Sequence, residues 1–138
     1  MRALPALLAL LLSVQAASAL DETGREAARA AISRQVEALG RDDAAGAYAQ
    51  AAPSIQAMFP NADLFLGMVR NGYAPVYRHR SFAFGDVTDA DEARLTQDVR
   101  IQDEQGVDWT AHYSVERQPD GSWRITGCRL TKLPGTNT

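Results

Sequence analysis

Few side chains in this sequence combine the types and spacings that catalysis requires. The two histidines, His79 and His112, fall in different predicted elements, and two histidines with no cysteine near them do not make a zinc site. The sequence contains no Walker-type phosphate loop, GxGxxG turn, paired cysteines, HExxH or GxSxG motif. It therefore predicts no catalytic residue, no metal site and no cofactor.

One pair of neighbouring carboxylates, Asp42 and Asp43, would suit acid–base chemistry if both groups faced one site. Consecutive residues of a helix point in different directions, however. Asp42 stands where a helix N-cap is expected, and Asp43 would lie at the positive end of the same helix. We therefore interpret the pair as the start of a helix.

Residues 107–132 carry the clearest structural pattern. From Val107 to Glu116 every second residue is apolar, which is the period of a strand with one buried face. The following QPDG, residues 118–121, predicts a turn because Pro presets φ and Gly accepts a positive φ. The alternation resumes at Trp123 and slips by one position at Gly127, which predicts a β-bulge.

The elements before this hairpin are predicted to be helices followed by two further strands. Helix starts are indicated by a capping box at residues 23–26 and by Asp42, Pro53 and Asn61. After residue 78 the apolar period changes from helical to two, which predicts strands around residues 82–84 and 95–101. The order predicts an α+β fold with three or four N-terminal helices on one face of a curved antiparallel sheet of about four strands.

The N-terminal stretch has the pattern of a cleavable signal peptide. A positive start at Arg2 is followed by an apolar run, and Ala17-Ser18-Ala19 fits the small-x-small pattern that precedes a cleavage site. The run is much shorter than the ~20 residues that a membrane-spanning helix needs. We expect residues 1–19 to be removed after Ala19, residues 20–138 to form one domain, and the product to be periplasmic or secreted.

Composition narrows the set of partners and the source of stability. The formal net charge is −3 and no basic block occurs, which disfavours nucleic acid as a partner and, after signal cleavage, a membrane. Cys128 is the single cysteine, so an exported chain would have no internal disulfide and would depend on packing. Cys128 falls on the predicted buried face, where a free thiol behaves as a small hydrophobic group.

Three groups of residues carry a resemblance to a known family. They are DDAA (42–45) with AAPSIQAMFP (51–60), GYAPVYR (72–78), and ERQPDGSWRI (116–125) with GC (127–128). On these segments the chain resembles an uncharacterised family of small exported bacterial proteins, a domain of unknown function within the nuclear transport factor 2-like (NTF2-like), or cystatin-like, superfamily. That resemblance implies a cone of helices and sheet with a cavity at its wide end, and frequent dimerisation through the convex sheet face. The superfamily includes isomerases, dehydratases, cyclases and non-catalytic binders, so it does not determine function.

A cone-shaped enzyme of this superfamily would need an acid or base inside the cavity, with its pKa tuned by apolar walls. The predicted inward-facing set contains no carboxylate and no histidine. Its members are Phe82, Phe84, Leu95, Gln97, Val99, Ile101, Trp109, Ala111, Tyr113, Val115, Trp123, Ile125, Cys128 and Leu130. Asp98, His112 and Glu116 fall on the outward face, and only a register error would bring one of them inside. The pattern argues against an isomerase or dehydratase.

Aromatic side chains predicted to face inward could instead wall a small apolar pocket with a few polar contacts. The candidate pocket residues are Tyr48, Phe59, Phe65, Tyr73, Tyr77, Arg78, Gln97, Trp109 and Tyr113. Arg78 belongs to a cationic cluster at the helix-to-sheet corner and could recognise an anion at the mouth of the pocket. In the alternative interpretation the aromatic residues fill the core, and Arg78 forms ion pairs with nearby acids at a solvated corner.

Three hypotheses follow. The first is a non-catalytic exported module that holds a small apolar or amphipathic molecule in the cone. The second is an interaction or scaffold domain whose outer sheet face, with Thr96, Thr110 and Ser114, forms a homodimer or docks a partner. The third is a cone-pocket isomerase or dehydratase that uses a tyrosine or an inward-swung Asp98 or His112. The inward-facing set favours binding over catalysis.

Overall fold

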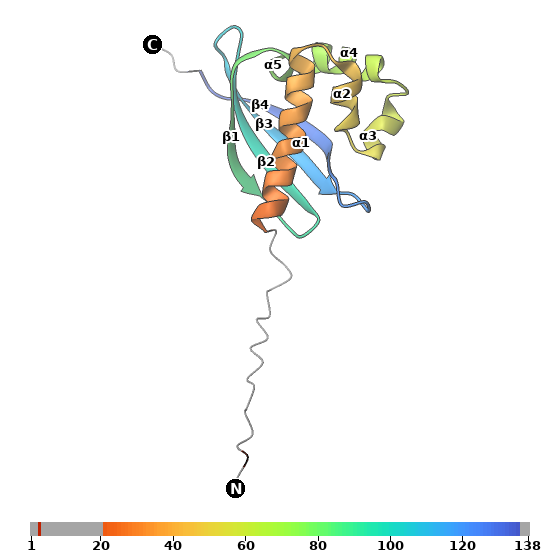
Figure 1. Ribbon diagram of the computed structural model, residues 1–138. Helices are drawn as coiled ribbons and strands as arrows, with labels where there is room; N and C mark the ends of the chain where they lie inside the picture. The colour runs from red at the N-terminus through yellow and green to blue at the C-terminus, as the bar shows by residue number, and fades with distance from the viewer. Residues whose placement is uncertain (1–2, 4–20, 136–138) are drawn as a thin grey trace.

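The structure is a computed structural model that describes Ala3 and residues 21–135. Its elements, in chain order, are α1 (Glu22–Gly40), α2 (Ala44–Ala49), α3 (Pro53–Met58), α4 (Ala62–Gly72), α5 (Ala74–Tyr77), β1 (His79–Thr88), β2 (Arg94–Asp103), β3 (Asp108–Arg117) and β4 (Trp123–Lys132) (Figure 1). The predicted signal peptide lies, apart from Ala3, outside the described residues. Within those residues no helix has both the length and the apolar character needed to cross a membrane.

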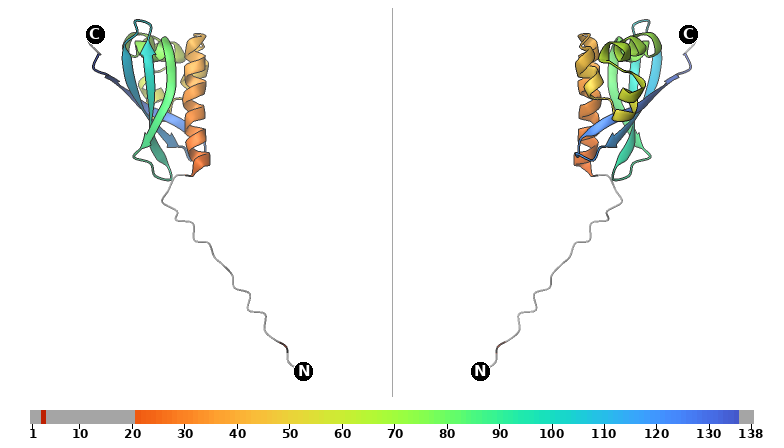
Figure 2. Two further views of the ribbon diagram at one scale, coloured as in Figure 1. Left: turned by 90° about the vertical axis from the view of Figure 1, so that its left-hand side faces the viewer. Right: turned by 90° about the vertical axis from the view of Figure 1, so that its right-hand side faces the viewer.

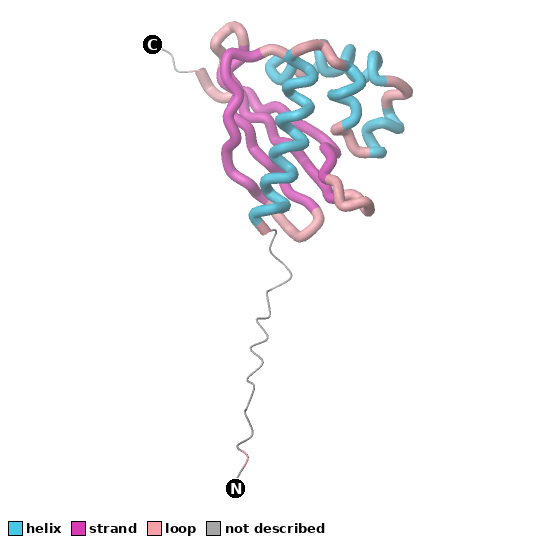
Figure 3. Tube along the Cα trace, viewed as in Figure 1, coloured by secondary structure: helices cyan, strands magenta, loops and turns pink. Residues whose placement is uncertain are grey.

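The four strands form one open antiparallel sheet in the order β1-β2-β3-β4, so every strand pairs with its neighbour in sequence (Figure 3). The helices lie on one face of this sheet, and the edge-on views of Figure 2 show the opposite face without a helix. The predicted α+β order is therefore confirmed. One helix more than predicted is present, because Pro75 opens the single turn of α5 instead of only ending the helix before it.

The register of the sheet agrees with the predicted alternation. Ser114 pairs with Gly127 and Val115 pairs with Ile125, which leaves Thr126 as the extra residue of a bulge in β4. Two further irregularities lie in β1, one between His79 and Ser81 and one between Phe84 and Val87. The bulge in β4 is the one that the sequence predicted, and it bends this strand where it meets the helical layer.

Two predicted helix starts are wrong by one or two residues. The N-cap of α1 is Asp21, whose Oδ1 accepts a hydrogen bond from Gly24 N at 2.8 Å, and Thr23 lies inside the helix. The N-cap of α2 is Asp43, whose Oδ1 accepts from Gly46 N at 3.0 Å. Asp42 has a φ of 55° and belongs to the turn between the two helices. The predicted cap of α4 is confirmed, since Asn61 Oδ1 accepts from the N–H of the third helical residue at 2.9 Å.

The core lies between α1 and the inner face of the sheet. Ala28, Ala31 and Ile32 of α1 are fully buried, as are Val99 of β2 and Val115 of β3. Because two of the three helical residues are alanines, the helix axis can approach the strands closely. The short helices α2 to α5 cover the remainder of the inner face, and the space that they leave forms the pocket described next.

Candidate ligand-binding pocket

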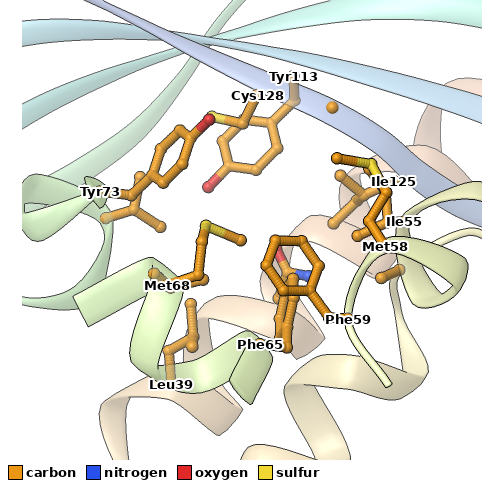
Figure 4. A pocket seen from close by; sticks show the side chains of 15 residues that line it. Leu39, Ile55, Met58, Phe59, Phe65, Met68, Tyr73, Tyr113, Ile125 and Cys128 are labelled. Atoms are coloured by element: carbon orange, nitrogen blue, oxygen red, sulfur yellow. The ribbon is translucent and has the colours of Figure 1, made fainter. Parts of the chain in front are cut away.

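A half-open pocket of about 300 Å³ lies between the helical layer and the bent end of β4 (Figure 4). Its walls come from α1, α3, α4, α5, β3 and β4 and from the turns beside the short helices. The apolar or weakly polar lining residues are Leu39, Ala51, Ile55, Met58, Phe59, Phe65, Met68, Val69, Tyr73, Val76, Tyr113, Ile125, Gly127 and Cys128, and Gln35 adds one amide. This combination of volume and apolar lining is typical of a small-molecule site.

The outer wall of the pocket is α3, and it is held mainly by polar contacts. None of its residues is fully buried. The Tyr48 hydroxyl donates to the carbonyl oxygens of Gln56 and Phe59, and Gln56 Nε2 donates in return to Tyr48 O at 3.0 Å and to Ala51 O at 3.2 Å. These reciprocal bonds fix α3 to α2 without filling the space beneath it.

Tyr113 of β3 forms the base of the pocket and is only 1% exposed. Figure 4 shows its hydroxyl pointing to the side of the pocket where Met68 and Tyr73 lie. Among the residues that the structure describes, no group makes a hydrogen bond of acceptable geometry with this buried hydroxyl. Burial raises the pKa of Tyr113 well above its ordinary value, so the phenol is neutral and can either donate or accept a hydrogen bond.

Cys128 lies opposite Tyr113 in the register and reaches the same pocket. Burial raises the pKa of its thiol to about 12. A nucleophilic cysteine needs a thiolate, which burial in apolar surroundings disfavours. The thiol lies near enough to the Tyr113 hydroxyl to influence its pKa, but no hydrogen bond of acceptable geometry joins the two groups. Because a neutral thiol is a weak hydrogen-bonding group, we assign Cys128 a packing role.

Four of the nine candidate pocket residues line this pocket: Phe59, Phe65, Tyr73 and Tyr113. The rings of Phe59 and Phe65 pack edge to face with their centroids 5.9 Å apart. Figure 4 shows the Tyr73 hydroxyl directed towards Cys128. The other five candidates, Tyr48, Tyr77, Arg78, Gln97 and Trp109, do not line it. Tyr48 instead anchors α3, as described above.

Tyr77 and Arg78 form a separate polar corner with Asp42. The Tyr77 hydroxyl donates to Asp42 Oδ1, and the guanidinium of Arg78 lies 3.9 Å from the centroid of the Tyr77 ring. Arg78 also donates to Asp42 Oδ2 at 3.1 Å and to Leu39 O at 3.0 Å. The hydrogen bond from Tyr77, with a smaller contribution from Arg78, lowers the pKa of Asp42. This geometry matches the interpretation of Arg78 as a corner residue with an acidic partner, not a residue that recognises an anion at the pocket.

Gln97 is completely buried and its side chain is fully paired. Its Nε2 donates to Gly85 O at 2.9 Å and to Asp98 O at 2.8 Å, while its Oε1 accepts from Arg29 Nε at 3.1 Å. These bonds tie α1 to the sheet. Gln97 is therefore a structural residue with no free group to offer a ligand.

Trp109 donates its indole N–H to Asp103 Oδ2 at 2.9 Å. Asp103 follows Ile101 on the inward face and is 8% exposed, so the prediction of an inward set without a carboxylate is wrong at this position. Asp103 Oδ1 accepts from the N–H groups of Gln105 and Val107 in the β2–β3 turn. The hydrogen bond from Trp109, followed by those of the turn, lowers the pKa of Asp103, which fixes this carboxylate as an ionised turn anchor.

The outward face carries one linked set of acid–base groups. His112 Nδ1 lies 2.7 Å from Asp98 Oδ1, and His112 Nε2 lies 3.1 Å from Thr131 Oγ1. All three residues occupy outward positions of β2, β3 and β4, as predicted for Asp98 and His112. They lie across the sheet from Tyr113, so they cannot act on a molecule in the pocket. Within residues 21–135 no cluster of three potential ligands could hold a metal ion.

The sequence did not single out Ile55, Met58 or Met68 as pocket residues. Met58 is 68% exposed, which is unusual for a large apolar side chain. The spacing of these residues on α3 and α4 indicated apolar anchors, and the large number of Met and aromatic residues in these short helices suggested that some of them line a cavity without indicating which. Nothing in that spacing distinguishes a side chain that borders a cavity from one that fills the core.

Comparison with known proteins adds a family but no activity. No curated protein is significantly similar to this sequence. A family model described as "Domain of unknown function (DUF4864)" matches residues 21–138, which includes every helix and strand described above. The family description assigns no reaction, ligand or partner. The chain therefore belongs to the DUF4864 family of domains of unknown function.

Proposed function

We propose that this chain is an exported, non-catalytic binding module that holds a small apolar or amphipathic molecule in the pocket above Tyr113. The observation that carries the proposal is the unpaired Tyr113 hydroxyl, which is buried at the base of an apolar cavity. An unpaired polar group in a protein interior costs about 1–3 kcal/mol. A ligand that pairs with it would remove that cost on binding.

The pocket volume limits the size of the ligand and its affinity. Because a cavity of roughly 150 Å³ holds benzene, a pocket of about 300 Å³ would hold a molecule of roughly 10–15 non-hydrogen atoms. At about −0.5 kcal/mol per atom, between the limits for very small and drug-sized ligands, binding would contribute about −6 kcal/mol. This corresponds to a Kd in the range of tens of micromolar.

Two further parts of the proposal concern fold family and location. The helices-then-strands order, the uncovered outer face and a pocket between the helical layer and the sheet support assignment to the NTF2-like superfamily. The signal-peptide pattern that ends at Ala19 supports export to the periplasm or the medium. N-terminal sequencing of the protein from the periplasmic fraction tests the second part, and a mature terminus other than Leu20 would contradict it.

The pocket hypothesis is tested by filling the pocket. 4-(Dimethylamino)benzonitrile, a neutral dye that fits the estimated ligand size and whose fluorescence rises in apolar surroundings, serves as the probe. Met68 lines the pocket from α4, whereas Leu64 of the same helix is 54% exposed and does not line it. We expect Met68→Trp to weaken dye binding at least tenfold and Leu64→Trp to leave it unchanged. Equal binding by both variants, each shown to be folded by circular dichroism, would contradict the proposal.

The alternative function is an interaction domain that dimerises through the outer sheet face. That face is not covered by any described helix, and Thr96, Thr110 and Ser114 occupy outward positions on it. Glu116 and Arg124 are opposed in register on this face, and Arg124 donates to Ser122 Oγ and to Ala49 O. Sedimentation equilibrium distinguishes the two functions, because only the alternative requires a dimer that Ser114→Arg disrupts.

A further inference from the structure

We infer that the pocket selects uncharged molecules with one hydrogen-bonding group, such as medium-chain alcohols, aldehydes or ketones, and rejects carboxylates and ammonium compounds of equal length. This inference rests on the proposed function and adds to it the chemical class of the ligand. It follows from which groups line the pocket, which of them are already paired, and which groups Arg78 and Arg29 contact.

No charged side chain lines the pocket among the residues that the structure describes. A carboxylate that entered it would lose its hydration without gaining a counter-ion, and such a transfer is strongly unfavourable. Two arginines on the helical side of the sheet are already paired with other groups. Arg78 is bonded to Asp42 and Leu39 O, and Arg29 is bonded to Gln97.

The polar side chains that line the pocket are an amide, two phenols and a thiol: Gln35, Tyr73, Tyr113 and Cys128. The Gln35 amide nitrogen already donates to Ala47 O at 3.2 Å. The thiol of Cys128 is neutral and is a weak partner. Tyr113 Oη is the buried oxygen without a partner among the described residues, and as a neutral phenol it can donate to a carbonyl or an ether and can exchange hydrogen bonds with an alcohol.

The aromatic lining raises the competing possibility of a cationic ligand held by cation–π contacts. Phe65 is shared between two aromatic neighbours, since its ring packs against Phe59 at 5.9 Å and against Tyr48 at 5.7 Å. Its ring is therefore engaged in packing within the helical layer. With no carboxylate on the walls to complement a cation, this arrangement favours an uncharged guest.

Three probes with one chain length test the inference: 1-octanol, octanoate and octylammonium. Each is titrated into the purified protein at pH 8 and followed by displacement of 4-(dimethylamino)benzonitrile. We expect 1-octanol to bind at least tenfold more tightly than either ion. Octanoate should approach the affinity of 1-octanol at pH 4, where most of it is the uncharged acid, with circular dichroism as the check on folding.

Two matched variants test the hydroxyl itself. We expect Tyr113→Phe to weaken 1-octanol binding roughly 5- to 100-fold, because the alcohol then loses its buried partner. Tyr77→Phe removes an identical hydroxyl that bonds to Asp42 outside the pocket, and it should leave the affinity unchanged.

Each outcome separates this inference from the proposed function. If neither the dye nor any of the three probes binds, the proposed function fails. If the dye binds but octanoate or octylammonium at pH 8 equals or exceeds 1-octanol, the pocket binds ligands and the selectivity inferred here is overturned. If Tyr113→Phe leaves 1-octanol affinity unchanged, the Tyr113 hydroxyl is not the partner and the inference is likewise overturned.

Discussion

Replacing Tyr113 by Phe should stabilise the ligand-free protein, although the side chain is only 1% exposed and lies in the core. The substitution removes one hydroxyl and retains the ring, including its edge contact with Phe82 at a centroid distance of 6.5 Å. In the folded protein this hydroxyl has no partner among the described residues, whereas in the unfolded chain it is hydrated. Removing it therefore removes a penalty that only the folded state carries.

The expected gain in the free energy of unfolding is about 1–2 kcal/mol, the lower part of the range for an unsatisfied buried polar group. For a domain of this length about 1 kcal/mol corresponds to roughly 3–6 °C in Tm, so Tyr113→Phe should raise Tm by about 3–12 °C. Tyr48→Phe makes the same chemical change where the hydroxyl donates to two carbonyl oxygens, and it should lower stability by about 1–2 kcal/mol.

Urea unfolding followed by circular dichroism measures both changes, on protein shown by native mass spectrometry to be free of ligand. Opposite signs for the two Tyr→Phe substitutions would support the assignment of Tyr113 as the unpaired hydroxyl. A loss of stability in Tyr113→Phe would refute the reasoning, since it would mean that the hydroxyl is paired in the folded protein, for example with the Cys128 thiol. The argument for a ligand would then lose its main support.

Two further predictions concern other buried groups. Cys128 should react with iodoacetamide at pH 8 far more slowly in the folded protein than in urea, because burial raises its thiol pKa to about 12. Mass spectrometry measures the rate of alkylation. Equal rates in the folded protein and in urea would contradict the packing role. Asp103 has a lowered pKa, so it stabilises the fold at pH values above its unfolded pKa of about 4 and loses this effect as the pH falls through its folded pKa. Unfolding free energies measured from pH 6 to pH 2.5 should accordingly fall less steeply in Asp103→Asn than in the wild type, and parallel curves would show that Asp103 contributes nothing to the acid dependence.

The strands could be predicted from sequence because the alternation of apolar residues is a property of neighbouring positions. The same holds for the bulge, where the pattern slips by one residue at Gly127 and the structure makes Thr126 the extra residue. Helix starts were less well determined. Asp21 and Thr23 can both cap the first helix, and Asp42 and Asp43 can both cap the second. The local sequence therefore offers two starts for each helix. The turn at Asp42, with its positive φ, determines which of the two is used there.

The pocket residues were harder to predict, because pocket and core residues have the same composition. Tyr48 and Tyr73 are both partly buried tyrosines near a helix end, yet the first bonds to the backbone of α3 and the second lines the cavity. Gln97 was predicted to face inward and does so, but its side-chain oxygen already accepts a hydrogen bond from Arg29, which is 68 positions away in the sequence. Contacts over such separations depend on the packing of helix on sheet, which the spacing of apolar residues does not encode.

What separates a pocket from an incompletely filled core is the pairing of the buried polar groups. Gln35, Gln97 and Asp103 are buried polar side chains of this domain, and each makes at least one of the hydrogen bonds described above. Tyr113 carries the one buried side-chain polar atom without a partner among the described residues, and its hydroxyl points into the cavity. A phenylalanine at this position would complete the core with no unpaired group. A tyrosine there costs stability unless a further molecule pairs with it, which is why the hydroxyl, more than the volume of the cavity, argues for a ligand.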